Sequence, residues 1–184
     1  FEKDFLKKII SKIKSKKFNL YPEVTNLYKL IAKQNKINLN RIILTAGIDG
    51  ALKNCFDLFV SKNDKVIMLR PTFAMVEIYC QIAGAKPVYI DYDKNLNLNY
   101  AKLLKSINKK ISLIVVSNPN SPTGTLMDLE SLEKVISKAN RFNIPILIDE
   151  AYYGFCNVTA FSLLKKYNNL IISRTFSKAF GLAG

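Results

Sequence analysis

The fold is decided by residues 113–149, LIVVSNPNSPTGTLMDLESLEKVISKANRFNIPILID. Two short apolar runs, 113–117 and 146–148, enclose a helical pattern over 128–142. Continuous apolar runs predict strands that are buried on both faces, and a helix between two such strands is typical of a right-handed βαβ crossover. Residues 113–149 therefore predict one unit of a parallel sheet that is covered by helices.

The same alternation continues on both sides of this unit. Four further apolar runs rich in Ile, Val and Leu predict strands, and helical patterns occupy the intervals between runs. The strand predictions are 42–45, 66–69, 87–90 and 170–173, and the helix predictions are 49–60, 73–83, 100–108 and a shorter one at 161–167. We therefore predict an α/β fold with a mostly parallel sheet flanked by helices on both faces.

The first forty residues have a different pattern. An amphipathic helix is predicted first, and the Tyr21-Pro22 break separates it from a second helical pattern. The apolar residues of the first helix are Phe5, Leu6, Ile9, Ile10 and Ile13. We assign residues 1–40 to an N-terminal helical segment and residues 41–184 to the α/β domain.

The composition restricts the possible chemistry. The 184 residues include no His. Triads that use imidazole and His-ligated zinc are therefore excluded, and acid–base chemistry must come from Lys, Tyr, Cys or a carboxylate. Cys55, Cys80 and Cys156 are too far apart in the sequence to form a thiolate metal site on their own, so we predict no metal site.

The net charge of +14 raises the possibility of a nucleic-acid or membrane partner. Residues 1–41 carry eleven Lys or Arg and three Asp or Glu, so over half of the excess lies there. Lys outnumbers Arg 24 to 4, whereas base readout favours Arg. No apolar run reaches the roughly 18 residues of a membrane span, and no secretory signal is evident. We predict a cytoplasmic protein that binds neither nucleic acid nor membrane, with a basic module for nucleic acid or an anionic surface as the alternative from another class.

Polar and small residues follow most of the predicted strands, at the edge where parallel sheets bind ligands. These segments are AGIDG (46–50), PTF (71–73), NPNSPTG (118–124), DEAYY (149–153) and RTFSK (174–178). Gly47 opens a helix whose N–H groups can hold an anion such as phosphate, although an ordinary turn would also use Gly. Thr175 and Ser177 add hydroxyl donors from another strand end. Together these groups predict a phosphate subsite.

Two charged residues and one loop stand out at this edge. Asp149 directly follows an apolar strand, so its carboxylate requires a cationic partner, with a helix cap or a structural ion pair as the alternative. Lys178 follows another strand, where desolvation would turn its amine into a nucleophile that forms a Schiff base. The loop 118–124 is suited to directing an amide at a ligand, or else simply makes two successive turns.

Taken together, these segments resemble the pyridoxal-phosphate (PLP) aminotransferases of fold type I, and within them most closely the histidinol-phosphate aminotransferase family. The matching motifs are YPEV (21–24), AGIDGAL (46–52), RPTFAMVEIY (70–79), NPNSPTG (118–124), DEAYYGF (149–155) and SRTFSKAFGLAG (173–184). The resemblance implies that residues 41–184 form the large PLP-binding domain of this fold, incomplete and without its C-terminal small domain.

The resemblance also implies the role of each site residue. Lys178 would form the Schiff base with PLP and move the proton at the substrate Cα, Asp149 would keep the pyridine nitrogen protonated, and Tyr152 would hydrogen-bond the phenolate oxygen. The other implied contacts of PLP are Phe73 and Ala151 on the ring faces, Gly47, Ile48, Asp49, Thr175 and Ser177 at the phosphate, and Asn120 or Ser121 at the phenolate oxygen.

The partners follow from the same resemblance. Tyr21 matches the family tyrosine that reaches the phosphate in the neighbouring subunit, which implies a homodimer. The implied reaction exchanges an amino group between a phosphorylated amino alcohol, such as histidinol phosphate, or a phosphorylated amino acid and a 2-oxo acid acceptor such as 2-oxoglutarate. The alternative is PLP-dependent decarboxylation of a phosphorylated amino acid such as threonine phosphate.

We expect this chain to be a fragment, because it stops two residues before the position at which the family has a phosphate-binding Arg. On its own, the 184-residue chain should therefore bind PLP weakly or not at all and have little transaminase activity. Reconstitution of the purified chain with PLP tests this expectation. A stable absorbance of the lysine-bound cofactor together with normal turnover would contradict it.

Overall fold

The computed structural model describes residues 3–12 and 20–183, and its contacts divide the chain into two units, Phe1–Leu44 and Thr45–Gly184. The first unit contains the two helices expected there, α1 (Lys3–Ser11) and α2 (Thr25–Asn35), followed by a short 3₁₀ helix, η2 (Leu39–Arg41). Ile13 of the predicted apolar stripe lies outside the described residues.

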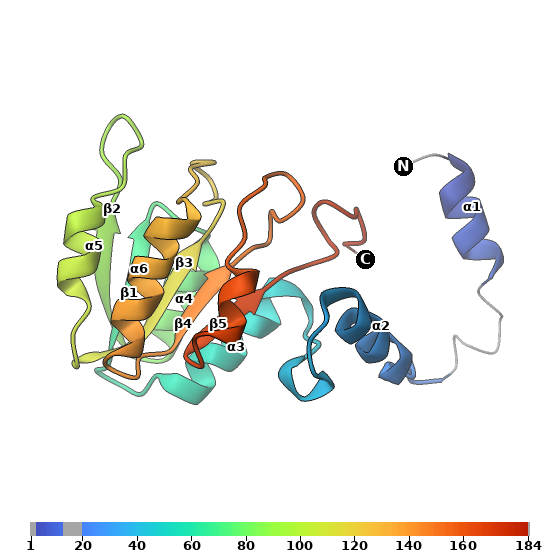
Figure 1. The fold of residues 1–184 in the computed structure, drawn as a ribbon, viewed down its shortest axis with the longest axis horizontal. Helices are drawn as coiled ribbons and strands as arrows, with labels where there is room; N and C mark the ends of the chain where they lie inside the picture. Colours follow the sequence, from blue (N-terminus) through green and yellow to red (C-terminus); the bar gives the residue numbers. More distant parts are fainter. Residues whose placement is uncertain (1–2, 13–19, 184) are drawn as a thin grey trace. The chain divides into compact units, whose positions relative to one another are not determined.

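The second unit is built on a sheet of five strands, all of them parallel, in the order β2-β1-β3-β4-β5 (Figure 1). The strands are β1 (Lys65–Arg70), β2 (Lys86–Asp91), β3 (Ile111–Ser117), β4 (Ile146–Asp149) and β5 (Leu170–Ser173). Each of them coincides with an apolar run in the sequence. The predicted α/β class with a largely parallel sheet is confirmed.

The run 42–45 was expected to be a strand, and that prediction is wrong. These residues have no regular secondary structure, and the side chain of Ile43 is 73% exposed. The backbone N–H of Leu44 donates to the hydroxyl of Tyr28 at 3.1 Å and so has a side-chain acceptor in place of a neighbouring strand. An apolar run becomes a strand only where another strand can pair with its backbone groups.

Helices cover both faces of the sheet (Figure 1). The helices of this unit are α3 (Gly47–Phe59), α4 (Ala74–Ile82), α5 (Tyr100–Ser106), α6 (Leu129–Asn140) and the 3₁₀ helix η3 (Phe161–Lys165). The segment predicted as a short helix at 161–167 is thus a 3₁₀ helix, the form in which short helical pieces commonly occur. None of the described helices is both long and apolar enough to cross a membrane.

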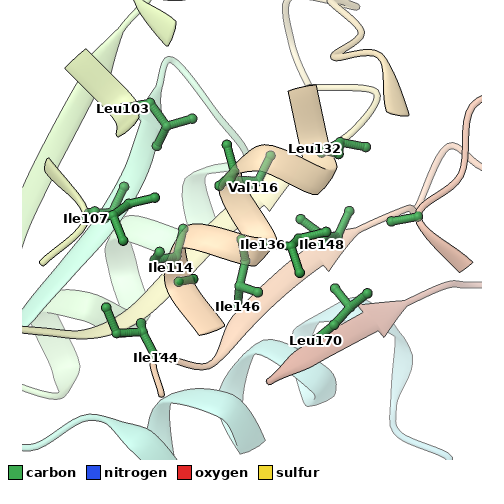
Figure 2. Close-up of a cluster of buried hydrophobic side chains, with 14 of the residues drawn as sticks. Leu103, Ile107, Ile114, Val116, Leu132, Ile136, Ile144, Ile146, Ile148 and Leu170 are labelled. Atoms are coloured by element: carbon green, nitrogen blue, oxygen red, sulfur yellow. The ribbon is translucent and has the colours of Figure 1, made fainter. Parts of the chain in front are cut away.

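The strands are buried on both faces because each face packs against its own set of helices. In β1, Ile67 and Leu69 belong to the larger core with α5, α6 and η3, whereas Val66 and Met68 belong to the core with α3 and α4. Figure 2 shows the larger core, where Ile136 of α6 lies among the β3 and β4 side chains. This double burial explains why the strands read as unbroken apolar runs.

The topology also determines where the candidate site lies. Because the strands are parallel, their carboxyl ends share one edge of the sheet. Helix α3 ends at Phe59, six residues before β1 begins at Lys65, so its other end, with Gly47, lies toward the carboxyl edge. All of the segments singled out from the sequence, apart from Tyr21 in the first unit, therefore start at or near this edge.

Truncation of Ile114 should destabilise the fold, because its side chain is fully buried in the central strand β3. Ile114→Ala removes methyl groups and leaves a cavity, which lowers the free energy of unfolding by about 2–5 kcal/mol. Ile82→Ala is the matched control, since Ile82 is 74% exposed at the end of α4, and should change it by less than about 0.5 kcal/mol. Urea denaturation measures both, and equal effects would contradict the assignment of the core.

Candidate active site

The centre of the candidate site is the carboxylate of Asp149, at the end of β4. The parallel register places Ser117 of β3 and Ser173 of β5 directly beside it. The hydroxyl of Ser173 donates to Asp149 Oδ1 at 3.3 Å, that of Ser117 donates to Oδ2 at 3.5 Å, and the N–H of Ala151 donates to Oδ1 at 2.9 Å. The side chain is thus held in one orientation by three neighbours, and Asp149 is only 3% exposed.

Burial dominates the electrostatics of this carboxylate. Desolvation raises the pKa of Asp149 from 3.8 to about 6, although the hydrogen bonds from Ala151, Ser173 and Ser117 oppose the shift. The salt bridges found within the described residues do not include Asp149. A structural ion pair, one of the alternatives that the sequence left open, is therefore not seen among the described residues. The site presents a buried acid that would be stabilised by an added cation.

The loop that follows β3 is held rigidly by its two asparagines. Asn120 is buried, and its amide group donates to the carbonyl of Pro71 at 3.0 Å and to Thr123 Oγ1 at 2.7 Å, while its oxygen accepts from Thr72 Oγ1 at 3.0 Å. Asn118 bonds in both directions to the backbone of Met127 (3.0 and 2.7 Å). The amide groups of this loop thus hold protein atoms together.

Ser121, the other candidate in this loop, is half-buried. No hydrogen bond of its hydroxyl to another described residue is found, so this group remains available for a ligand.

Two hydroxyl groups and Lys178 follow β5. Thr175 Oγ1 donates to Ser177 Oγ at 2.9 Å and accepts from the Ser177 N–H at 3.1 Å, so the two hydroxyls lie side by side. The amine of Lys178 lies 5.6 Å from the ring centroid of Tyr152, within the range of a cation–π contact. The segments that follow β4 and β5 therefore bring these predicted residues together.

Glycine is required at the start of α3. Gly47 has φ = +65°, a left-handed conformation in which a side chain would be strained, and it is exposed. Asp49 is exposed in the first turn of α3, and Ile48 packs against the core beneath it. The N–H of Gly47 donates to the carbonyl of Thr45 at 2.8 Å, so the N–H groups of Ile48 and Asp49 are the ones in this first turn that can hold an anion.

The remaining predicted residues occupy three different environments. Phe73 precedes α4 and packs against the core that α3 and α4 form with the sheet. Ala151 is buried beside Asp149. Tyr21 belongs to the first unit, and its side chain is fully exposed.

Sequence reasoning assigned no role to four polar residues that the structure places at this edge, although it listed Glu150 and Arg174 within the segments that follow strands. Ser117 and Ser173 flank Asp149, and Glu150 pairs with Arg174. The signal for the two serines was present, because each is the last residue of an apolar run next to the strand that ends in Asp149. Among the described residues, no group of three or more Cys, Asp or Glu side chains is placed to hold a metal ion.

Comparison with known proteins gives the family. The family model described as "Aminotransferase class I and II" matches residues 3–184. The chain belongs to this family. The resemblance noted from the sequence motifs is thereby confirmed.

Individual members of the family give a closer comparison. The chain is 34% identical over 169 residues to a histidinol-phosphate aminotransferase of Dehalococcoides mccartyi, a match that covers 91% of this chain and 46% of the relative. The structure of a histidinol-phosphate aminotransferase from Clostridium acetobutylicum superimposes with a TM-score of 0.81 at 27% identity, covering 98% of this chain and 53% of the other. The chain thus spans about half the length of the relatives it matches.

A third comparison concerns the fold alone. The histidinol-phosphate aminotransferase of Sinorhizobium meliloti, whose structure is a complex with PLP, has a TM-score of 0.79 at 24% identity and covers 86% of this chain and 44% of that one. The fold is that of the fold type I PLP-dependent aminotransferases, as the motifs implied.

The raised pKa of Asp149 predicts how stability depends on pH. The folded-state pKa of about 6 lies above the ordinary value of 3.8, so protonated Asp149 stabilises the cofactor-free fold below pH 3.8, and this stabilisation is lost as pH rises through 6. The span of 6 − 3.8 pH units corresponds to about 3 kcal/mol. Asp149→Asn keeps a neutral side chain of the same shape, so it should be more stable than the wild type at pH 7 and no more stable near pH 4.

Urea denaturation from pH 4 to pH 8 measures the difference between the two proteins. The matched control is Asp91→Asn, because the ion pair with Arg70 lowers the pKa of Asp91 and reverses the sign of the effect. Parallel pH profiles of the wild type and Asp149→Asn would contradict the prediction.

Proposed function

We propose that the protein is a PLP-dependent aminotransferase of the histidinol-phosphate type. It would exchange an amino group between a phosphorylated amino alcohol or amino acid and a 2-oxo acid such as 2-oxoglutarate. The observation that carries the proposal is the buried carboxylate of Asp149, which lacks a cation among the described residues and lies between two strand ends that carry hydroxyl and amine groups. The names of the relatives support the substrate class.

The residues of the edge fit PLP by their chemistry. Asp149 would hold the protonated pyridine nitrogen, since a cation there removes the cost of the buried charge. The phosphate would bind the hydroxyls of Thr175 and Ser177 together with the first-turn N–H groups of Ile48 and Asp49, which Gly47 leads into through its left-handed turn. PLP in the Sinorhizobium meliloti structure supports this choice of cofactor.

The ring and its phenolate oxygen use the remaining residues. Phe73 and Ala151 would pack on the two faces of the ring, and Tyr152 would donate to the phenolate oxygen. Because the amide of Asn120 is occupied by Pro71, Thr72 and Thr123, Ser121 is the better candidate for a second contact with that oxygen.

Each residue contributes a defined step. Bound PLP supplies an electron sink for negative charge at the substrate Cα. Asp149 would keep a proton on the pyridine nitrogen, so that the ring can accept negative charge from Cα. Lys178 would hold the cofactor through its amine and would remove and return the proton at the substrate Cα, an acid–base task that a chain without His must give to another side chain.

A homodimer and a cytoplasmic location complete the proposal. Tyr21 would reach the phosphate in the neighbouring subunit of the dimer. Its side chain is fully exposed in the single chain, so it is free to contact a second copy. The cysteines Cys55, Cys80 and Cys156 are free thiols, which favours a reducing compartment.

Replacement of Lys178 tests the function. In the protein expressed from its natural gene, Lys178→Ala should lower the rate of amino-group exchange between histidinol phosphate and 2-oxoglutarate by about 10²- to 10⁴-fold, because it removes the group that moves the Cα proton. Borohydride reduction followed by peptide mass spectrometry should find the cofactor on Lys178 in the wild type and on no lysine in the variant.

Lys94→Ala is the matched control, since Lys94 is exposed in the loop after β2, and it should behave as the wild type. Retention of the reduced adduct and of turnover by Lys178→Ala would contradict the role of Lys178. Release of CO₂ from a phosphorylated amino acid, without formation of a new 2-oxo acid, would favour the decarboxylase in place of the aminotransferase.

A further inference from the structure

An ion pair that is largely enclosed joins the segments after β4 and β5. Glu150 is 1% exposed, and its Oε2 accepts from Arg174 Nε at 3.0 Å and lies 2.9 Å from Arg174 Nη2. The two guanidinium nitrogens converge on this one carboxylate oxygen, and the rigid fork of the arginine limits how Arg174 can turn relative to Glu150. Among the ion pairs of the described residues, this is the one with a buried carboxylate.

The surroundings of the pair satisfy its hydrogen bonds. Glu150 Oε1 accepts from the N–H of Ala160 at 2.7 Å, and the hydroxyl of Thr159 lies 2.9 Å from both carboxylate oxygens and 2.9 Å from Arg174 Nη2. The guanidinium carbon of Arg174 lies 3.6 Å from the ring centroid of Tyr153 and 4.8 Å from that of Phe161. The arginine is therefore held by stacking as well as by charge.

The place of the pair in the sequence suggests what it does. Glu150 directly follows Asp149, and Arg174 directly precedes Thr175 and lies four residues before Lys178. A shift of Arg174 relative to Glu150 would therefore also shift residues 175–178, with their hydroxyl and amine groups, relative to the carboxylate of Asp149. Exposed ion pairs contribute little to the free energy of unfolding, and buried ion pairs often contribute no more than well-packed apolar residues would. We therefore look for the role of this pair in the positions that it gives to neighbouring residues.

We propose that Glu150 and Arg174 are positioning residues that hold residues 175–178 in register with Asp149 and Tyr152. In the absence of ligand, the pair keeps the amine of Lys178 beside the Tyr152 ring and the Thr175 and Ser177 hydroxyls at the edge. The inference rests on the proposed function because it takes PLP to be the ligand of that edge.

The test is made in the protein expressed from its natural gene and removes both charges of the Glu150–Arg174 pair, so that no single buried charge is left. In the double variant Glu150→Gln with Arg174→Met, the glutamine oxygen still accepts from Ala160, and the methionine still packs between Tyr153 and Phe161. We expect the affinity for PLP to fall at least about tenfold, because small displacements of binding groups have large effects. Hydrogen exchange of the backbone amides of 175–178 in the cofactor-free protein should accelerate by a similar factor, while the free energy of unfolding stays near that of the wild type.

A second variant covers the case in which the double variant does not fold. Arg174→Lys keeps the charge next to Glu150 but loses the paired contacts and the stacking, so it should show the same two changes to a smaller extent. Arg70→Gln breaks the exposed pair with Asp91, which joins β1 and β2 on the opposite side of the sheet from β4 and β5, and should leave PLP affinity and the exchange of 175–178 unchanged.

The outcomes separate this inference from the proposed function. Folded variants that bind PLP as tightly as the wild type, with unchanged exchange at 175–178, would overturn the positioning role. Failure of the wild-type protein expressed from its natural gene to bind PLP would overturn the proposed function, while the exchange measurement would still decide whether the pair orders residues 175–178.

Discussion

The cost of burying one carboxylate governs the active edge of this domain. A parallel sheet with helices on both faces places the ends of its strands in a dry environment, and the register of β3, β4 and β5 puts Asp149 between two serines there. Its desolvation is only partly offset by three hydrogen bonds, as the raised pKa shows. The asparagine loop follows β3 on one side of this group, and the segment with the hydroxyls and the lysine follows β5 on the other.

The neighbouring acid shows the opposite arrangement. Glu150 is as deeply buried as Asp149, yet its charge is compensated within the protein by Arg174 and by hydrogen bonds from Thr159 and Ala160. Two adjacent acids of equal burial thus differ in one respect: the first lacks a cation among the described residues, and the second has one. Under the proposed function, this difference would distinguish a ligand-binding group from a structural group more clearly than burial does.

Much of the fold and part of the site were predictable from the sequence, for physical reasons that differ between residues. The five strands read directly from their apolar runs because both faces of each strand are buried. The run 42–45 misled because apolar character does not reveal whether a pairing strand exists. Asp149 and Lys178 were found from their position after strands, whereas the link between Glu150 and Arg174 depends on side-chain directions that one-dimensional spacing does not contain. The hydrogen bonds of the Asn120 amide to Pro71, Thr72 and Thr123 could not be predicted for the same reason.

The carboxylate of Asp149, which has no cationic partner among the described residues, also bears on the stability of the protein in the cell. A cation that binds at Asp149 stabilises the folded state by mass action, and the chain without that ligand unfolds more often. Proteases and chaperones act on such transiently unfolded chains, so a modest change in stability alters steady-state abundance several-fold. Under the proposed function, the amount of folded protein would then follow the supply of PLP.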